Sequence, residues 1–477
     1  MSSFYIENFG CRATQADGAA IEHQFRELGL DRAPDRNAAR YVVLNTCAVT
    51  ASAEQDARAA IRRTKRQNPG CKIVVTGCYA QRVPAEIAAL PGVFAVVGNS
   101  HKSNLAQIAL RKDSEKGGYE EGCFVPASTL SAPPGAEIFV SDIFAHTELL
   151  AAPVFDSANE RTRPNLKVQD GCNNRCSFCV IPSLRGRSRS LPLEEVVREI
   201  NQLVEAGYRE VVISGINQGR WGRDLQMSNG HPLKFEELIG AILDETPLEK
   251  LRISSVEPMD WSDWLIRLMA DSSRIAKHAH VPMQSGSDAV LRRMHRKYRP
   301  WHYCEKIEKI RAALPDAAIG ADVMVGFPGE SEVEFEETRR MIEHLPFTYL
   351  HVFTFSSRPG TPAATMPNQV PVRVARERNR ILRELATEKK QAFMRSFLGK
   401  PLPAITLSTV NEGTDGAWTG ALTDNYLKMN VRGKHVSNRW LNTVVDAVED
   451  GSLIGSESFP ETETLQATSL QPALREK

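Results

Sequence analysis

Residues 172–179 read Cys172-Asn173-Asn174-Arg175-Cys176-Ser177-Phe178-Cys179, and the interpretation of the whole chain starts from this run. Its three cysteines follow the spacing C-x3-C-x2-C, so that their thiolates can surround a single cubic iron-sulfur cluster. A zinc site would need a fourth sulfur or nitrogen ligand, and residues 180–185 supply none. The run therefore predicts a [4Fe-4S] cluster with three protein ligands, which leaves one iron open to another group.

The run follows the first of six short β-rich stretches that alternate with helical stretches. A repeated strand-helix pattern of this kind predicts a barrel or partial barrel, with a doubly wound sheet as the alternative. In a barrel, active sites gather at the carboxyl ends of the strands. The predicted strands are 166–169, 210–214, 251–254, 279–282, 319–325 and 349–355, separated by helical stretches such as 193–206, 261–270 and 331–344.

The N-terminal part of the chain shows the same alternation and carries a second set of cysteines. Cys11, Cys47 and Cys78 each follow a predicted strand of a parallel sheet. The carboxyl ends of such strands lie at one edge of the sheet, so we expect these thiols to meet in a second three-cysteine site. The predicted strands are 4–7, 41–44, 72–75 and 94–97, and the predicted helices are 19–28, 53–66 and 84–90.

The remainder of the chain divides into a connecting segment and a β-rich C-terminal region. Residues 112–160 show no sustained period, with one strand expected at 138–140. After a charged helix at 372–397, extended runs at 404–407, 417–421, 426–431 and 443–448 predict a small all-β barrel. The expected domains are 1–111, 161–397 and 398–455, joined by the 112–160 segment and followed by a disordered tail at 456–477.

Composition limits the class of protein without identifying a partner. The chain has 477 residues, 25% of them charged and 42% hydrophobic, with a formal net charge of +1, as expected for a globular protein of about three domains. No signal peptide or long apolar run is present, so a cytoplasmic protein with no membrane attachment is expected. Nine cysteines in a reducing compartment favour metal binding over disulfides.

With Phe178 before its last cysteine, the 172–179 run resembles that of the radical S-adenosylmethionine (SAM) enzymes. Gly326-Phe327-Pro328-Gly329 matches the GxPG segment that this superfamily places near the adenine of SAM. Phe9-Gly10-Cys11, the stretch from Asn45 to Thr50 and the stretch from Thr76 to Gln81 narrow the resemblance to the methylthiotransferases. This resemblance covers essentially the whole chain.

The resemblance implies a fold and a set of cofactors. It implies an N-terminal Rossmann or flavodoxin-like α/β domain that holds an auxiliary [4Fe-4S] cluster through Cys11, Cys47 and Cys78. It also implies a central partial (βα)6 TIM-like barrel that holds a radical SAM [4Fe-4S] cluster through Cys172, Cys176 and Cys179. The C-terminal region is then a TRAM domain, an OB-like β-barrel that binds RNA.

Within this family the chain is most similar to the threonylcarbamoyladenosine branch, through residues 45–50, 61–63, 172–179 and 356–361. Arg12 and Thr14 depart from the family pattern, which usually has lysine and asparagine there. The implied reaction converts N6-threonylcarbamoyladenosine at tRNA position 37 to its 2-methylthio derivative. One SAM donates a methyl group, and a second yields the 5′-deoxyadenosyl radical that activates C2 of the adenine.

Candidate binding residues follow from this assignment, while no catalytic residue is assigned beyond the cluster ligands. The expected SAM contacts are Phe178, Gly215, Asn217, Glu257, Gln284, Gly326 and Pro328. The expected RNA contacts are Arg62, Arg63, Arg185 and Arg187, because such groups commonly bind phosphates beside a reacting base. The expected partners are the anticodon stem-loop of tRNA and an external electron donor, with no obligate protein partner.

Several residues are expected to play structural roles. Cys71, Cys123 and Cys304 do not lie at the carboxyl end of a strand and are expected to be no ligands. His278 and His280 alternate along a strand, so both are expected to face the same side. At most one of them is expected to reach a ligand, and the role of a satisfied polar core residue is favoured. Tyr298 and Trp301 interrupt a basic run at 292–299 and are expected more often to pack in the core than to stack on a base.

Other functions also fit the sequence. Within the family, the substrate could be isopentenyladenosine in tRNA or an aspartate of a ribosomal protein. In a different class, the chain would be a non-enzymatic iron-sulfur or zinc module that binds RNA.

Overall fold

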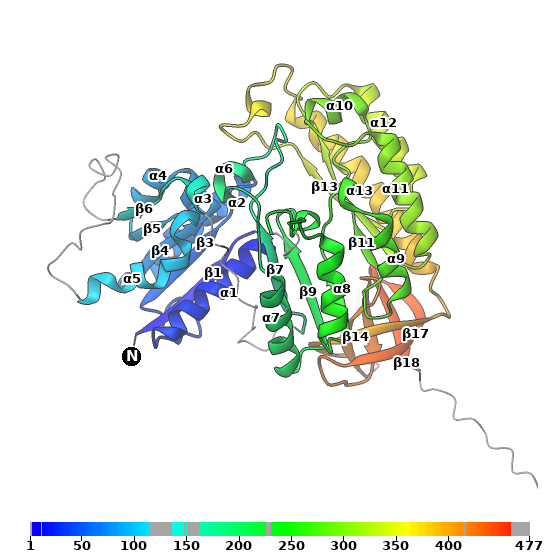
Figure 1. Cartoon of the computed structure of the whole chain (residues 1–477), viewed down its shortest axis with the longest axis horizontal. Coiled ribbons are helices and arrows are strands. Elements are labelled where there is room, and N and C mark those ends of the chain that lie inside the picture. The colour runs from blue at the N-terminus through cyan, green and yellow to red at the C-terminus, as the bar shows by residue number, and fades with distance from the viewer. Residues whose placement is uncertain are drawn as a thin grey trace, which may run out of the picture. The chain divides into compact units, whose positions relative to one another are not determined.

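A computed structural model describes residues 2–10, 12–114, 136–146, 149, 162–225, 230–413 and 416–458 (Figure 1). The chain divides into two compact units, residues 1–393 with 424–426 and residues 394–423 with 427–477. The expected tail beyond residue 458, most of the connecting segment and Cys123 lie outside the described residues. Within the described part of the chain, no helix is long and apolar enough to cross a bilayer.

The first unit begins with a six-stranded parallel sheet in the order β2-β1-β3-β4-β5-β6. Its first five strands have the 2-1-3-4-5 order of flavodoxin-like folds, which confirms the expected α/β architecture. All four predicted strands are present, and the strand expected near 138–140 joins this sheet beside β5. The strands are β1 (Ser3–Asn8), β2 (Asp31–Arg32), β3 (Tyr41–Thr46), β4 (Lys72–Gly77), β5 (Val93–Val97) and β6 (Glu137–Phe139).

Both faces of this sheet are covered because its central strands are apolar on both sides. Val42 and Leu44 of β3 pack in one hydrophobic cluster with Ile61 of α2, whereas Val43 packs in another with Phe25 of α1. Helix α1 begins well before the predicted start at residue 19, and α3 was not predicted. The helices are α1 (Arg12–Glu27), α2 (Ala51–Gln67), α3 (Cys78–Arg82), α4 (Pro84–Ala88) and α5 (Leu105–Ser114).

The six predicted βα units form a partial barrel of parallel strands. Strands β7, β9 and β10 pair in one sheet and β11, β12 and β13 in another, and single bridges such as Ser255↔His280 join the two. The prediction of a partial barrel is confirmed over the doubly wound alternative. The strands are β7 (Asn165–Asp170), β9 (Glu210–Gly215), β10 (Lys250–Ile253), β11 (His278–His280), β12 (Ala318–Val325) and β13 (Tyr349–Thr354), with β8 (Arg189–Ser190) antiparallel to β7.

Helices cover the outer face of this partial barrel (Figure 1). Alternate residues of β12, such as Ile319, Ala321 and Val323, belong to the hydrophobic cluster that the helices complete. Gly320 and Asp322 occupy the positions between them and therefore face the inner side. The helices are α6 (Ile181–Arg185), α7 (Leu193–Glu205), α8 (Phe235–Glu245), α9 (Asp263–Asp271), α10 (Asp288–Arg293), α11 (Pro300–Ala313), α12 (Glu332–His344) and α13 (Val372–Arg395).

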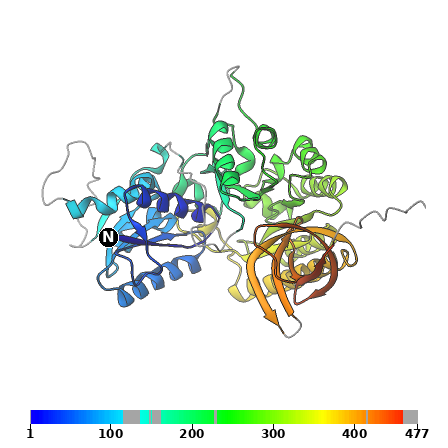
Figure 2. The ribbon, with the colours of Figure 1, turned by 90° about the horizontal axis from the view of Figure 1, so that it is seen from below.

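The second unit is a closed five-stranded barrel, drawn in orange to red in Figure 2. Its strand order is β14-β15-β16-β18-β17, and every pairing is antiparallel except that of β16 with β18. The all-β prediction is confirmed, although β18 was not predicted; its Leu453 is fully buried and closes the barrel. The strands are β14 (Pro401–Gly413), β15 (Gly416–Thr423), β16 (Lys428–Arg432), β17 (Trp440–Glu449) and β18 (Ser452–Glu457).

Candidate active site

The N-terminal cysteines lie at the carboxyl edge of the first sheet. Thr46 pairs with Gly77 at the ends of β3 and β4, so Cys47 and Cys78, the next residues along each strand, come side by side. Both are buried. A Cβ placed on Gly10 would lie 2.9 Å from the Cys47 sulfur, which brings the end of the β1 segment to the same place. Cys11 lies outside the described residues, and its part in this site stays a prediction.

Gly77 is the residue that makes this geometry possible. Its φ is +96°, and a Cβ there would lie 2.2 Å from the backbone oxygen of Thr46. Any other residue would combine an unfavourable backbone conformation with a clash against the neighbouring strand. The glycine therefore allows β4 to turn directly into α3, so that Cys78 is the first residue of the helix.

The second cysteine set lies in the loop after β7, where backbone hydrogen bonds hold it. The Cys172 amide donates to the Gly186 carbonyl at 3.1 Å, and the Cys179 amide donates to the Cys176 carbonyl at 3.1 Å. Ser177 anchors the loop to the end of α10, since its amide donates to the Met294 carbonyl and its hydroxyl to the Arg293 carbonyl. The loop thus has a fixed shape that holds three thiols together.

The chemistry of these thiols fits a metal cluster. Burial raises the pKa of the Cys172 thiol and raises that of Cys179 to about 12. Backbone N–H donors oppose this effect, and the neighbouring thiols add to it. Without a metal these groups therefore stay protonated at neutral pH, whereas a bound metal ion displaces the protons and stabilises the thiolates. Three partly buried sulfur donors in one short loop are the donor set that an iron-sulfur cluster requires.

Arg296 is a site residue that the sequence did not single out. Its guanidinium donates to the Cys176 sulfur at 3.3 Å and forms an ion pair with Glu257. In the sequence it lies within the basic run 292–299, where a buried arginine cannot be told from exposed ones. The structure separates it from that run, because its side chain is only 5% exposed.

Two of the predicted SAM contacts carry unpaired buried acceptors. Neither the side-chain oxygen of Asn217 nor that of Gln284 has a hydrogen-bond partner, although both are buried. The Asn217 amide nitrogen donates to the Cys172 sulfur at 3.8 Å, which places this side chain beside the cluster loop. Gln284 has φ +62°, a strained conformation for a residue other than glycine. Unpaired buried acceptors are costly, so they fit a ligand that donates hydrogen bonds, as the amino group of SAM does.

The other predicted SAM contacts are explained in part by packing. Gly215 lies against Gln169, since a Cβ on it would be 3.0 Å from that side chain, and Phe178 packs against the barrel core. Gly326 has φ +75°, and a Cβ on it would lie 2.6 Å from the Cβ of Ala375 on α13. Its amide donates to Glu330. Pro328 is buried in the following turn. Glu257 is linked to the cluster loop through Arg296, which contacts both Glu257 and Cys176.

The two cysteine sets lie beside one another. Cys78 packs in the same hydrophobic cluster as Val180 and Leu184, which lie one and five residues after Cys179 in the chain. The Asn99 side chain bridges the two segments, donating to the Cys78 sulfur at 3.6 Å and to the Leu184 carbonyl at 2.8 Å. A second contact involves the residue after Cys47: Arg358, which follows β13 of the barrel, donates to the Ala48 carbonyl at 3.3 Å. Groups bound by the two sets would therefore be neighbours.

A buried ion network fixes this arrangement. Asp17 of α1 contacts Lys102 at 2.9 Å, Arg185 at 2.9 Å and Lys167 of β7. Asp170, at the end of β7, contacts Lys167 at 2.9 Å and Arg185 at 3.0 Å. Burial would raise the pKa of Asp17, but the three cations outweigh it and hold that pKa well below its usual range. Both carboxylates are thus anionic, and they join the first helix to the strand that precedes the cluster loop.

The network corrects one predicted RNA contact. Arg185 is only 3% exposed and its guanidinium is committed to the two carboxylates, so the prediction that it binds RNA is wrong. Arg62, Arg63 and Arg187 are exposed. Arg63 forms an ion pair with Glu7 at 3.3 Å.

The structure shows where the residues expected to be structural lie. His278 and His280 face the same side, since ring nitrogens of both lie within 2.6 Å and 2.9 Å of the Tyr349 hydroxyl. Tyr298 is buried and donates to the Met283 carbonyl, whereas Trp301 is 57% exposed and does not pack in the core. Cys71 is buried in the first sheet's core, and Cys304 is half-buried on α11.

Comparison with known proteins agrees with this geometry. Residues 166–342 match the model of the Radical SAM superfamily, and residues 3–98 match Uncharacterized protein family UPF0004. A protein of Bacillus subtilis (strain 168), the threonylcarbamoyladenosine tRNA methylthiotransferase MtaB, is 37% identical over 91% of both chains. The protein of the same name from Aquifex aeolicus is 35% identical over 90% of this chain and 96% of its own. The chain belongs to the methylthiotransferase family of radical SAM enzymes.

Other relatives in this family differ in name. A tRNA-2-methylthio-N(6)-dimethylallyladenosine synthase of Salinispora arenicola is 34% identical and covers 88% of this chain and 79% of its own. Among solved structures, the radical SAM methyltransferase TsrM of Kitasatospora setae has a TM-score of 0.54 at 14% identity, covering 76% of this chain and 74% of its own. At that identity the likeness concerns the fold alone. Family membership makes SAM and [4Fe-4S] clusters the cofactors, and both cysteine sets provide suitable donors.

We expect Asp17→Asn to lower the free energy of unfolding by about 3 kcal/mol or more, because it leaves three buried cations facing one carboxylate. Glu27→Gln, on the same helix, is the matched control. Its carboxylate is 64% exposed, so the change should stay within about 0.5 kcal/mol. Urea unfolding followed by circular dichroism measures both. Equal effects of the two substitutions would contradict the structural role of the network.

The lowered pKa of Asp17 predicts that the stability of the fold depends on pH. The pKa of Asp17 is lowered on folding, so its contribution is fully present above about pH 4 and is lost as the pH falls toward the lower folded-state pKa. The stability of the wild type should therefore fall steeply below pH 4, and that of Asp17→Asn less steeply. Unfolding curves between about pH 2.5 and 7 test the difference in slope.

Iron content tests the two cysteine sets separately. A chain with two [4Fe-4S] clusters binds about 8 iron, and Cys78→Ala or Cys176→Ala should each reduce this to about 4. Cys304→Ala, which removes a half-buried thiol outside both sets, should keep about 8. Iron and sulfide are measured on anaerobically reconstituted protein. A loss in the Cys304 variant equal to that in the others would contradict the assignment.

Proposed function

We propose that this protein is a tRNA methylthiotransferase that converts N6-threonylcarbamoyladenosine at position 37 to its 2-methylthio derivative. The proximity of the two cysteine sets carries the proposal. Cys78 shares a hydrophobic cluster with the residues that follow Cys179. Insertion of a sulfur group into an unreactive carbon needs a sulfur carrier close to the place where that carbon is activated, and such proximity supplies much of the rate.

In this proposal each cysteine set holds one cluster. Cys172, Cys176 and Cys179 would hold the cluster that binds SAM, and Cys11, Cys47 and Cys78 would hold the auxiliary one. When bound, SAM would supply the methyl group and the precursor of the radical, and the cluster beside it would pass on the electron that an external donor provides. The protein holds the ligands in place: Arg296 donates to the Cys176 sulfur, and Asn99 to that of Cys78. The hydrophobic cluster around Cys78 keeps water from that site.

The SAM contacts are proposed on two grounds. Asn217 and Gln284 offer buried oxygens without partners, and the carboxylate of Glu257 lies beside the cluster loop through Arg296. These three groups suit the donor groups and the positive charge of SAM. Phe178, Gly215, Gly326 and Pro328 are proposed from family resemblance alone.

RNA binding is proposed for exposed arginines and for the C-terminal barrel. Arg62 and Arg63 lie on α2, which begins a few residues after Cys47, and Arg187 follows the second cysteine set. The domains proposed are 1–111 for the auxiliary cluster, 161–397 for radical SAM chemistry and 398–455 as the RNA-binding TRAM domain. An external electron donor and action in the cytoplasm, where tRNA is found, complete the proposal.

Two relatives that align with most of the chain are named for different modified nucleosides, threonylcarbamoyladenosine and dimethylallyladenosine. The experiment therefore tests which substrate this protein accepts. The reconstituted protein should add a methylthio group to tRNA that carries threonylcarbamoyladenosine, detected by mass spectrometry of digested nucleosides. Parallel reactions contain tRNA with isopentenyladenosine and, separately, ribosomal protein. Product from either of these in place of the first would refute the proposed substrate. Cys78→Ala should abolish the reaction while Cys304→Ala retains it.

The exposed arginines predict an ionic component of tRNA affinity. Arg62→Ala combined with Arg187→Ala should weaken binding and reduce the slope of log K against log salt by about 1 for each phosphate that is no longer neutralised. Arg340→Ala, which removes an exposed arginine from α12 on the outer face of the barrel, is the control. Fluorescence anisotropy with labelled anticodon stem-loop at several salt concentrations measures the slope. An unchanged slope in the double variant would show that Arg62 and Arg187 do not contact tRNA phosphates.

A further inference from the structure

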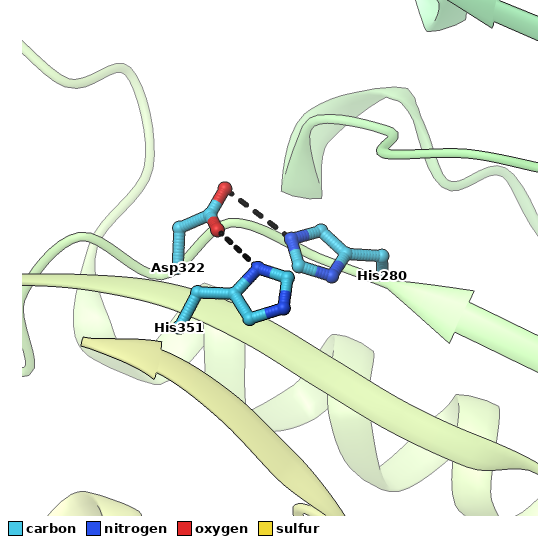
Figure 3. Close-up of side chains that lie close together, drawn as sticks. All are labelled: His280, Asp322 and His351. Atoms are coloured by element: carbon cyan, nitrogen blue, oxygen red, sulfur yellow. Dashed lines mark ion pairs between the residues drawn. The ribbon is translucent and has the colours of Figure 1, made fainter. Parts of the chain in front are cut away.

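A group of two histidines and one aspartate lies on the inner face of the partial barrel, apart from the cysteines. His280 ends β11, Asp322 lies in the middle of β12, and His351 lies on β13 (Figure 3). The pairing register explains why they meet. Asp322 pairs directly with His351, and His280 pairs with Gly320, two residues before Asp322 on the same face.

Their donor atoms lie close enough together to surround one small cation, and the two shortest distances involve different oxygens of Asp322. Nε2 of His280 lies 3.2 Å from Oδ2 of Asp322, and Nδ1 of His351 lies 3.3 Å from Oδ1. Each residue offers one ligand atom, and the three atoms lie within 4.8 Å of one another. A tetrahedral ion with bonds of about 2.1 Å would separate neighbouring ligand atoms by about 3.4 Å. Figure 3 shows the two imidazoles next to one another, each facing a different oxygen of the Asp322 carboxylate.

The Tyr349 hydroxyl contacts Nδ1 of His280 and so can leave Nε2 free to bind a metal ion. Nδ1 lies 2.9 Å from the Tyr349 hydroxyl, which also lies 2.6 Å from Nε2 of His278. When Nδ1 carries the proton and donates it to Tyr349, the lone pair of Nε2 is directed at the group. Metal-binding histidines are usually oriented in this way by a hydrogen bond from the other nitrogen.

The charge of the group also favours a cation. The group contains one carboxylate, which is partly shielded from water, since the side chain of Asp322 is 29% exposed and that of His280 is 8% exposed. A divalent cation would neutralise it.

We propose that His280, Asp322 and His351 bind a divalent transition-metal ion of the Zn²⁺ class. Two nitrogen donors and one oxygen donor suit Zn²⁺ and its neighbours in the first transition row better than Mg²⁺ or Ca²⁺, which prefer oxygen alone. The side chain of His351 is 62% exposed, so the ion keeps at least one position open on the inner side of the barrel. Three protein ligands and an open position are the arrangement of zinc sites that bind a further ligand.

The test uses full-length protein with both clusters in place, so that the cysteines are not free to bind zinc. Anaerobic equilibrium dialysis against ZnSO4 is followed by measurement of zinc and iron in the same sample. Wild type should bind one zinc per chain with its iron unchanged, and His351→Ala and Asp322→Asn should each weaken zinc binding by about tenfold or more. His344→Ala, which removes a histidine at the end of α12, outside the group, should bind as the wild type does.

Cobalt gives an independent readout of the ligands. Co²⁺ bound by the wild type should show the absorption of nitrogen and oxygen ligands without a sulfur-to-metal charge-transfer band, and His351→Ala should remove this spectrum. Zinc binding that is the same in wild type and both variants, or no zinc binding by cluster-loaded wild type, would overturn the proposal. If Asp322→Asn loses structure by circular dichroism, the largely exposed His351 still carries the test.

Discussion

The structure depends on the burial of five charged groups around Asp17. Two carboxylates and three cations, each no more than 9% exposed, come from α1, the segment before α5, β7 and α6. Removing such groups from water costs several kcal/mol for each ion, and only a complete set of partners offsets that cost. The network therefore tolerates a single arrangement of these segments. Because β7 leads directly into the cysteine loop, the same arrangement fixes where that loop begins.

The excess positive charge of this network complements the cysteines that lie beside it. Three cations face two carboxylates, and the pKa of Lys102 is affected by the nearby Cys78 as well as by burial, which lowers it. A cation in excess is unfavourable in an apolar interior unless an anion is close. Thiolates that hold a metal cluster are such anions. The buried cations and the cysteines are thus complementary, although they are distant in the sequence.

The sequence predicted those features that depend on local pattern. Strands at the cores of both sheets are recognisable because their apolar residues face helices on one or both sides. The cysteine sets could be found because each follows a strand or lies in one loop. Arg185 and Arg296 could not be assigned, since nothing in a basic run indicates which arginines meet buried partners from other elements. Strand β18 was missed because its polar residues conceal Leu453, whose burial depends on closure of the barrel.

The roles of the two histidines of β11 also could not be predicted from the local sequence pattern. Alternation along the strand placed His278 and His280 on one face, but their roles depend on residues from β12 and β13 that only the sheet register brings near. Tyr349 contacts both rings and so makes one hydroxyl the shared partner of two imidazoles. Only one proton on that oxygen can be donated, so at least one of the two histidines must act as the donor. If His280 is that donor and its ring is neutral, its remaining nitrogen is an acceptor directed at Asp322. Two anionic or neutral acceptors in contact are favourable only when a proton or a metal ion lies between them.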